Sequence, residues 1–380
     1  MTSDPSAAVR RPSLLLRAVL VLALTLAILF ALEGGARIVQ RLRTGDWSGT
    51  RLTALDRELA VAATLYRTHP YLVVAPHEGA RVAVFGKHAG FSSLGYRSPE
   101  RPLAKPAGTR RILCVGGSTT FDLLAERDEA TWPWLLEDRL RAGGERVEVW
   151  NAGFPGWTSL ESTLSLAVRD ADLRPDLVIV FHGLNDLRPG SHRSFDRQYE
   201  HGHAELARRV LGLERDPLTW AQRSVLVEGL GDLLRGGPTN PWTVRTAPAS
   251  TARAQRLPAA AVAVFGRNLR SLAGLAAAHG AKVLFVTQRV RIREPSAAAD
   301  RDLLAQWLPG LEPSAVPAEL ERLDDVTRLL AAEGVGTLAD AAREVPWTDG
   351  DFADAMHFSE QGSRALAAYL QPRVAHRAER

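Results

Sequence analysis

Five residues of this chain are of the types from which an acyl-transfer site is built: Ser118, Gly156, Asn185, Asp354 and His357. Acyl transfer needs a nucleophile, a base, a residue that orients the base, and N–H donors that face the oxyanion. The five residues include a candidate for each role. Asp354 and His357 are three residues apart, so they can lie one turn apart with the carboxylate bonded to the imidazole. Taken alone, Ser118 after two glycines is better explained as a turn residue.

Strands that end beside these residues are the elements that must position them. Three predicted strands precede the first three candidates: Ile112–Val115, Val147–Trp150 and Leu177–Phe181, of which the first and third are continuous apolar runs. Such continuous apolar runs are typical of strands buried on both faces of a parallel sheet. Because the carboxyl ends of parallel strands lie on one edge, we expect Ser118, Gly156 and Asn185 to converge there.

The rest of the chain alternates helical and strand patterns. Further strands are expected at Lys282–Thr287 and Val335–Leu338. Helices are expected at Thr131–Arg141, after a capping box of Thr158 and Glu161, and at Pro258–His279, Ala318–Ala332 and Ser359–Leu370. This alternation predicts an α/β fold with a parallel sheet between two helical layers. The stretches 187–257 and 288–317 are expected to be irregular, and 187–257 is interpreted as an insertion that covers the strand ends.

Composition excludes several classes of protein. The chain has 380 residues, 46% of them hydrophobic, which supports a sizeable core and excludes a disordered chain. The formal net charge is +4, carried almost wholly by arginines scattered among acidic residues. No long basic run is present, so no nucleic-acid partner is expected. The single cysteine, Cys114, lies in a predicted strand and is expected to be a small core residue.

The apolar stretch Leu14–Leu32 predicts an N-terminal transmembrane helix. It is just long enough to span a bilayer if Arg17 reaches the interface with its charged end. A cleaved signal peptide is the second interpretation, and a buried core helix is the third. The predicted organisation is a tail and anchor at 1–36, a linker and small β-rich lead-in at 37–109, and a main domain at 110–380.

Four short motifs, taken together, resemble those of the SGNH hydrolases, also called GDSL-type esterases and lipases. They are Gly116-Gly-Ser-Thr119, Asn151-Ala-Gly-Phe-Pro-Gly156, Gly183-Leu-Asn-Asp186 and Asp354-Ala-Met-His357. Their order and spacing agree with the family over about Arg110–Leu370, and four motifs in order are far more specific than one. The segment Ser92–Arg97 also resembles a branch with an N-terminal membrane segment. The resemblance implies a flavodoxin-like three-layer sandwich.

The resemblance also implies roles for the five residues. Ser118 is the implied nucleophile, His357 the general base, and Asp354 the residue that holds the imidazole tautomer. The implied oxyanion donors are the backbone N–H groups of Ser118 and Gly156 and the side-chain amide of Asn185. No metal or cofactor is implied. The family's usual aspartate before the serine is Gly117 here.

A membrane-anchored serine hydrolase is the function that follows from the resemblance. It would cleave carboxylic esters on a small molecule, or on an acylated glycan or lipid of the cell envelope, with its catalytic domain in the periplasm or at the surface of a bacterium. Transfer of the acyl group to a sugar hydroxyl, as in an O-acetyltransferase, is an alternative. A noncatalytic binding module on the same scaffold is another, disfavoured because Ser118, Asn185 and His357 are all retained.

Three other features have weaker interpretations. His201-Gly-His203 lacks further ligands at metal-site spacing, so a loop is the better interpretation. Gly116-Gly117 lies outside any GxGxxG or P-loop pattern, which argues against a phosphate site. Trp220 and Trp242 are interpreted as lining a sugar or lipid site, or as packing under a cap.

Overall fold

The computed structural model describes residues 13–45, 47, 49–72, 74–84, 86–192, 194–198, 208, 211, 213, 216–238, 241, 253–291 and 298–375. The chain divides into two compact units. The helical unit consists of Met1–Leu55 and Asp216–Pro241, and the sheet unit consists of Asp56–Arg215 and Trp242–Arg380. All five candidate site residues belong to the sheet unit.

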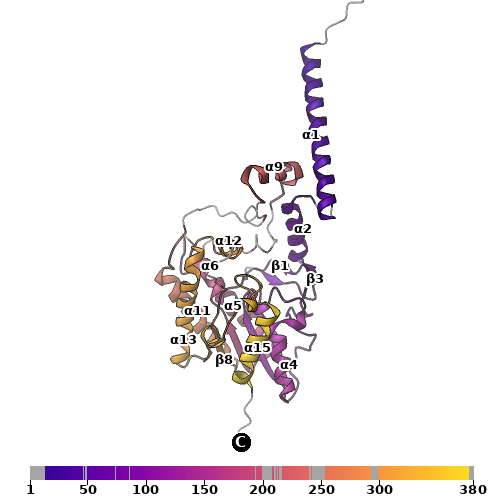
Figure 1. Cartoon of the computed structure of the whole chain (residues 1–380). Helices are drawn as coiled ribbons and strands as arrows, with labels where there is room; N and C mark the ends of the chain where they lie inside the picture. Colours follow the sequence, from indigo (N-terminus) through magenta and orange to yellow (C-terminus); the bar gives the residue numbers. More distant parts are fainter. Residues whose placement is uncertain are drawn as a thin grey trace, which may run out of the picture. The chain divides into compact units, whose positions relative to one another are not determined.

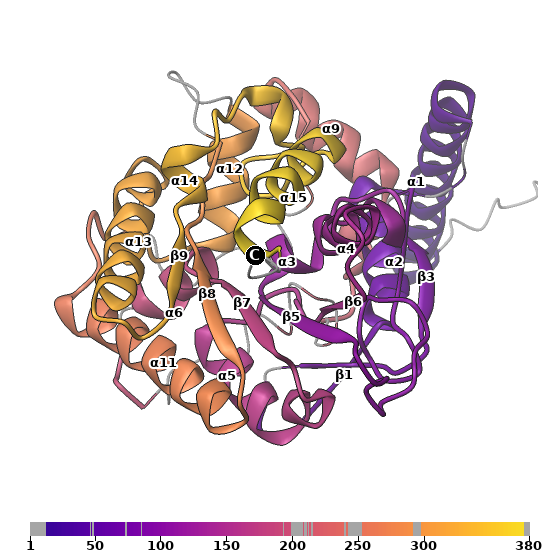
Figure 2. The same cartoon turned by 90° about the horizontal axis from the view of Figure 1, so that it is seen from below.

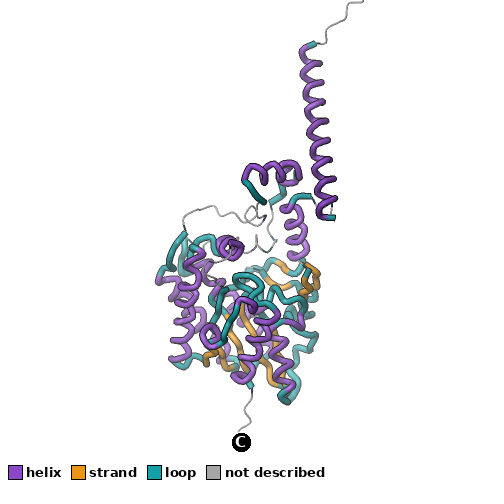
Figure 3. The backbone as a smooth tube through the Cα atoms, in the orientation of Figure 1, coloured by secondary structure: helices purple, strands orange, loops and turns teal. Residues whose placement is uncertain are grey.

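A five-stranded parallel sheet lies at the centre of the sheet unit. In spatial order its strands are β6 (Val147–Asn151), β5 (Arg110–Gly116), β7 (Leu177–Phe181), β8 (Lys282–Val286) and β9 (Thr337–Ala339). The second strand in the chain therefore lies outside the first, which is the 2-1-3-4-5 order of flavodoxin-like folds. The predicted fold class is confirmed: helices cover both faces of a parallel sheet (Figures 2 and 3).

Alternate residues of each strand point to opposite helical layers. In β5, Leu113 and Val115 pack against one layer, whereas Ile112 and Cys114 pack against the other. The first layer consists of α5 (Ser159–Val168), α11 (Ala259–Ala278) and α13 (Val316–Ala332). The second layer consists of α4 (Trp132–Ala142) and α15 (Glu360–Val374). Since both faces are buried, the strands are predominantly apolar, and the buried Arg111 of β5 and Glu148 of β6 are exceptions.

The lead-in to the sheet consists of one helix and two small antiparallel ladders. Its elements are α2 (Arg51–Ala63), β1 (Tyr66–Arg67), β2 (Ala75–Pro76), β3 (Arg81–Val84) and β4 (Lys87–Gly90). Shorter helices lie in the connections: α3 (Ser118–Phe121), α6 (Leu187–Gly190), α14 (Ala341–Glu344), and the 3₁₀ turns Asp128–Ala130, Asp170–Leu173, Leu184–Asp186, Pro313–Ala315 and Asp349–Asp351.

The sequence predicts the last helix but places its end too early, and it misses other helices altogether. The last helix continues to Val374, four residues beyond the expected end, because Leu370 and Val374 both pack into the core. Helix α12 (Ala298–Trp307) lies in a stretch that was expected to be irregular. It is only ten residues long, and its Asp300 pairs with Arg291 at 2.6 Å, so tertiary contacts rather than periodicity stabilise it.

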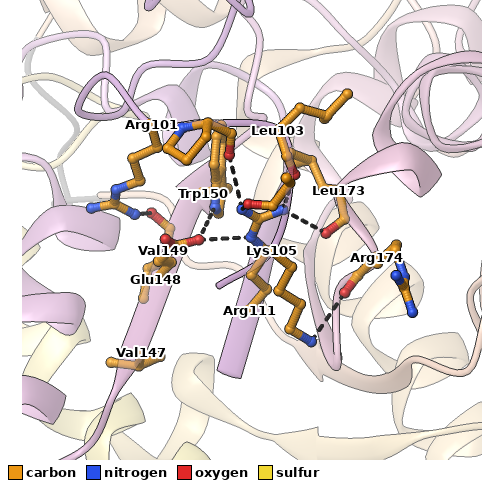
Figure 4. A network of polar contacts seen from close by, with 12 residues as sticks. Arg101, Leu103, Lys105, Arg111, Val147, Glu148, Val149, Trp150, Leu173 and Arg174 are labelled. Carbon is orange, nitrogen blue, oxygen red and sulfur yellow. Dashed lines mark hydrogen bonds and ion pairs between the residues drawn. The ribbon is translucent and has the colours of Figure 1, made fainter. Parts of the chain in front are cut away.

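Arg111 is a buried cation that fastens the proline-rich segment before the sheet to the sheet itself (Figure 4). Its Nε donates to Glu148 Oε2 at 2.6 Å. Its two terminal nitrogens donate to four backbone carbonyls, those of Pro102, Leu103, Ala104 and Leu173. All five guanidinium N–H groups are therefore satisfied, which offsets the cost of burying the charge.

The helical unit contains α1 (Leu14–Thr44), α8 (Trp220–Arg223) and α9 (Val225–Arg235). Among the described residues, α1 is the one helix long and apolar enough to cross a membrane, and none of its residues is buried. The helix runs unbroken through Gly34-Gly35 and ends at Gly45, whose φ of 74° is left-handed. Helices α8 and α9 lie in the part of 187–257 that was expected to be irregular. Trp220 is 73% exposed, so it does not pack under a cap.

Replacing Arg111 with methionine should destabilise the sheet unit. The substitution leaves Glu148 buried without its cation, a change that typically costs about 3–5 kcal/mol. We expect urea unfolding to show that the free energy of unfolding is lower in the variant by this amount. Arg146→Met is the matched control, since Arg146 is exposed, and it should change the free energy of unfolding by less than about 0.5 kcal/mol. Equal effects of the two substitutions would contradict a structural role for the Arg111 network.

Candidate active site

Ser118 lies where β5 ends, and two glycines make room for it. A Cβ at Gly116 would lie 2.5 Å from the Phe181 carbonyl oxygen, and a Cβ at Gly117 would lie 2.3 Å from Asn185 Nδ2. Both distances are far below van der Waals contact, so a side chain at Gly116 would displace the backbone of β7, and a side chain at Gly117 would displace the Asn185 amide. The loop then begins α3, with Ser118 as its first residue.

Ser118, His357 and Asp354 form a continuous hydrogen-bonded chain. The Ser118 Oγ atom lies 2.8 Å from His357 Nε2, and His357 Nδ1 lies 2.8 Å from Asp354 Oδ2. The other carboxylate oxygen of Asp354 accepts the backbone N–H groups of Met356 and His357 at 2.7 and 2.8 Å. These bonds fix the carboxylate, which in turn fixes the imidazole ring. Ser118 and His357 are both buried.

The charges around His357 favour its protonated form. Burial alone would lower the pKa of the imidazole, but attraction by Asp354, the hydrogen bond to Asp354 and the charge of Asp122 together raise that pKa above 6.5. For Asp354 the balance is reversed: burial would raise the pKa of the carboxyl, and the contacts with His357 bring it below its ordinary value. The pair is thus arranged to hold a positive imidazolium beside a negative carboxylate.

A second carboxylate, Asp122, lies behind the histidine. It accepts hydrogen bonds from Trp132 N–H at 2.8 Å and Ser363 Oγ at 2.7 Å. Burial raises the pKa of Asp122 to about 6. Its backbone has a φ of 64°, uncommon for a residue with a side chain, and Arg97 stabilises it by donating to the Asp122 carbonyl at 2.8 Å. Because Arg97 belongs to the lead-in, that segment supports the loop after Ser118.

Three N–H groups are candidates for donors to an oxyanion. In the part of the chain that the structure describes, neither the Ser118 nor the Gly156 N–H donates to a protein acceptor. Gly156 has a φ of 84°, a left-handed conformation that favours glycine. The Asn185 amide donates to the Trp157 carbonyl at 2.8 Å, and its Oδ1 accepts Trp307 Nε1 at 2.9 Å. These bonds orient the amide and leave its second N–H available.

Two residues that sequence reasoning missed hold these donors in place. Arg188 donates to the Gly156 carbonyl at 2.8 Å, and its guanidinium lies 4.3 Å from the centre of the Trp307 ring. Arg188 is buried, and burial lowers its pKa to about 10. The sequence offers one clue to Arg188, because this residue lies only three positions after Asn185. Trp307 lies 122 residues beyond Asn185 and on the unexpected helix α12, so no local pattern pointed to it.

A polar network lies beneath the Asn185 loop. Asp186 accepts the Ser159 hydroxyl at 2.5 Å and the Ser159 N–H at 3.1 Å, and burial raises the pKa of Asp186 to about 7. His182 bonds Ser162 Oγ at 2.8 Å, and burial lowers the pKa of His182 to about 3. This network joins the end of β7 to α5, and burial favours the neutral form of the His182 imidazole.

Other sequence candidates have the following outcomes. Within the described ranges, no group of three or more His, Cys, Asp or Glu side chains is placed to hold a metal. His201, His203 and Trp242 lie outside the described residues. Cys114 is a buried free thiol in β5.

An apolar cavity of about 340 Å³ opens beside Ser118 and His357. It is lined by residues of α2 and the rest of the lead-in, of the loop after Ser118, and of α12. Its volume falls at the lower end of the ~300–1,000 Å³ range of small-molecule sites.

Residues 114–365 match the model of the GDSL-like lipase/acylhydrolase family. Among solved structures, TesA is 21% identical with a TM-score of 0.41, over 69% of this chain and 97% of that one. A lipase/acylhydrolase from Enterococcus faecalis is 20% identical with a TM-score of 0.41, over 70% and 95%. The acetyl xylan esterase AlAXEase is 13% identical with a TM-score of 0.39, over 70% and 99%. No curated protein has a significant sequence match to the chain.

The charge of Asp354 should be visible in the titration of His357. We expect NMR of the imidazole ring to give a midpoint above 6.5, because the carboxylate outweighs burial. Asp354→Asn removes that charge, and the midpoint should fall by about one pH unit or more. Asp351→Asn is the control, since Asp351 bonds Thr348 and Gln361 rather than His357. A larger fall in the Asp351 variant would show that the partner of His357 is misidentified.

Proposed function

The chain belongs to the GDSL-like lipase/acylhydrolase family, and on that premise we propose that it is a serine esterase that cleaves carboxylic esters through an acyl-enzyme. The observation that carries the proposal is the hydrogen-bonded chain from Ser118 through His357 to Asp354. A serine hydroxyl is a weak nucleophile until a base takes its proton, and the Nε2 atom 2.8 Å away is placed to do so.

In the first half of the proposed reaction, Ser118 Oγ attacks the ester carbonyl while its proton passes to His357 Nε2. The carbonyl oxygen becomes an oxyanion that faces the N–H groups of Ser118, Gly156 and Asn185. As the tetrahedral intermediate collapses, the bond to the alcohol breaks and His357 gives its proton to the departing oxygen. Asp354 stays ionised and stabilises the imidazolium, consistent with the raised pKa of His357.

In the second half, water repeats these steps on the acyl-enzyme. His357 takes a proton from the water, the hydroxyl oxygen attacks the acyl carbon, and the same donors face the new oxyanion. Collapse breaks the bond to Ser118 Oγ, which recovers its proton from His357, and the carboxylic acid leaves. Neutral His357 is needed at the start of each half, so kcat/KM should fall as the pH drops below the raised pKa of His357.

We also propose that α1 is retained as a single-span anchor, with the sheet unit outside the cytoplasm. Glu33, directly after the apolar stretch Leu14–Leu32, accepts the Ser224 hydroxyl at 2.7 Å and the N–H groups of Val225 and Leu226 at 3.1 and 3.0 Å. Arg37 also donates to the Arg223 carbonyl at 3.0 Å. These contacts use the C-terminal part of α1 as a structural element, which favours an anchor over a discarded signal peptide.

The nucleophile is tested by covalent labelling. Wild-type protein should react with a fluorophosphonate, and Ser118→Ala should abolish the labelling while the circular dichroism spectrum is unchanged. Ser363→Ala is the matched control, because Ser363 is a buried serine that bonds Asp122 rather than His357. Labelling of the Ser118 variant at the wild-type rate would exclude Ser118 as the nucleophile.

The amide of Asn185 is tested by kinetics. Asn185→Ala should lower kcat by about 100- to 1,000-fold with a smaller change in KM, because an oxyanion donor acts mainly in the transition state. Trp307→Phe keeps the amide but removes the hydrogen bond that orients it, so its effect on kcat should be smaller. An unchanged kcat in the Asn185 variant would remove that residue from the site.

The anchor is tested on the full chain. A reporter fused after Arg380 should be active only outside the cytoplasm, and alkaline carbonate should leave the protein in the membrane pellet. Release by high salt, or a cytoplasmic signal from the reporter, would contradict the anchored topology.

A further inference from the structure

We infer that the acyl group of the substrate is a medium-length alkyl chain, held in the apolar cavity beside Ser118. This inference rests on the proposed esterase function and names the class of ester that it serves. Ser118, Gly156 and His357 all line the cavity. The carbonyl group of an acyl chain that binds there would therefore lie beside the proposed nucleophile. The other lining side chains are largely aliphatic or aromatic, among them Leu59, Leu65, Phe121, Leu211, Leu303 and Met356.

The chemistry of the lining favours an alkyl chain over a sugar. Apart from the proposed catalytic residues, the polar side chains on the cavity wall are Lys87 and Gln306, with the phenol of Tyr66. A sugar ring has several hydroxyl groups that need partners when they leave water, and such a wall supplies few. An alkyl chain needs none and gains free energy from each methylene that it buries.

The volume of the cavity sets the length of the chain. A methylene occupies about the same space as a water molecule in the liquid, ~30 Å³. A cavity of about 340 Å³ therefore has room for roughly eleven such groups, which is enough for a chain of about eight to ten carbons together with its carbonyl oxygen. An acetyl group would leave most of it unfilled.

One wall of the cavity lies outside the segment that matches the family. Leu59, Ala62 and Leu65 come from α2 and its end, and Ala89 comes from β4. These residues precede the segment 114–365 that matches the family. The lead-in therefore contributes to specificity as well as to the support of the Ser118 loop by Arg97.

The test is a series of p-nitrophenyl esters from acetate to dodecanoate, assayed with the full-length protein below the critical micelle concentration of each ester. We expect kcat/KM to rise by about threefold to fourfold per methylene, to a maximum near eight to ten carbons. A flat profile, or a maximum at acetate, would overturn the acyl-chain assignment. Failure to hydrolyse any ester, with no fluorophosphonate labelling, would instead contradict the proposed function.

A matched pair of variants places the chain in the cavity. Ala62→Phe fills it from α2 and should lower the octanoate-to-acetate ratio of kcat/KM by about tenfold or more. Val61→Phe, on the same helix but 42% exposed and outside the lining, should leave the ratio unchanged. If Ala62→Phe does not fold, Ala89→Phe fills the cavity from β4 and should have the same effect. An unchanged ratio in folded cavity variants would place the chain elsewhere.

A different observation, within the helical unit, carries a second inference: we propose that the apolar side of α9 lies in the lipid interface. Val227, Leu230 and Leu234 follow helical spacing, and they are 40%, 52% and 87% exposed. On the opposite side Glu228 and Asp232 pair with Arg51, at 3.5 and 2.6 Å. This division into an exposed apolar side and a charged side allows a helix to lie in the plane of a membrane interface with its apolar side toward the acyl chains.

The contacts of α9 with α1 fix the depth at which it lies. Glu33 caps the N-terminus of α9 and directly follows the apolar stretch of α1. Figure 1 shows α9 beside the C-terminal half of α1. If α1 spans the bilayer, its apolar stretch ends at the boundary between acyl chains and headgroups, and α9 begins there. The occupant of the exposed leucine face is therefore the lipid surface.

Labelled cysteines in proteoliposomes test this placement, since Cys114 is buried and does not compete for the label. A fluorophore at Leu230→Cys should be quenched by a lipid-borne quencher and protected from aqueous iodide. A fluorophore at Arg235→Cys, on the charged side of α9, should be quenched by aqueous iodide and protected from the lipid-borne quencher. Equal iodide quenching at both positions would overturn the interfacial placement, whereas loss of the protein to the carbonate supernatant would contradict the anchor itself.

Discussion

The close approach of the loops after β5 and β7 is the constraint on which the rest of the candidate site depends. Gly117 and Asn185 meet at a distance that leaves no room for a Cβ. Parallel strands set the direction of both loops, but the missing side chains allow them to touch. Ser118 is the first residue of α3, and its hydroxyl faces His357, which lies 239 residues later in the sequence. A side chain at Gly117 would displace the Asn185 amide, and a side chain at Gly116 would meet the backbone carbonyl of Phe181 at 2.5 Å.

Buried cations make the surrounding frame rigid. Arg111 bonds the proline-rich segment to β5 and β6, and Arg97 bonds the lead-in to the backbone of Phe121 and Asp122. Each guanidinium bonds several carbonyls at once, which fixes irregular segments that have no ladder or helix of their own. A site that stabilises a transition state must keep its donors in place before the substrate arrives. The hydrogen bonds of Arg111 and Arg97 hold the segments around the candidate site in such a fixed arrangement.

The sheet and the order of its parts could be predicted from the sequence because their signals are local. The runs at Ile112–Val115 and Leu177–Phe181 are apolar for their whole length, and the capping box at Thr158 is visible in four residues. Helix α12 could not be predicted, since a ten-residue helix with a paired Asp300 owes its stability to the residues around it. The same is true of Trp307, whose contact with Asn185 exists only once the chain has folded.

Trp307 connects the cavity that we propose for the acyl chain with the proposed oxyanion donors. Its ring lines the apolar cavity, its Nε1 orients Asn185, and the guanidinium stacked on it holds the carbonyl of Gly156. A chain that fills the cavity packs against the residue that positions two of the three donors. Binding energy from a part of the substrate remote from the reaction can then improve the geometry of the transition state as well as the affinity. On the proposed assignment of the acyl chain to this cavity, we expect a short acyl group to lower turnover as well as binding, because it leaves the indole without its packing partner. Gly117, directly before the proposed nucleophile, leaves space for Asn185, whose amide is oriented by Trp307 on the wall of the cavity.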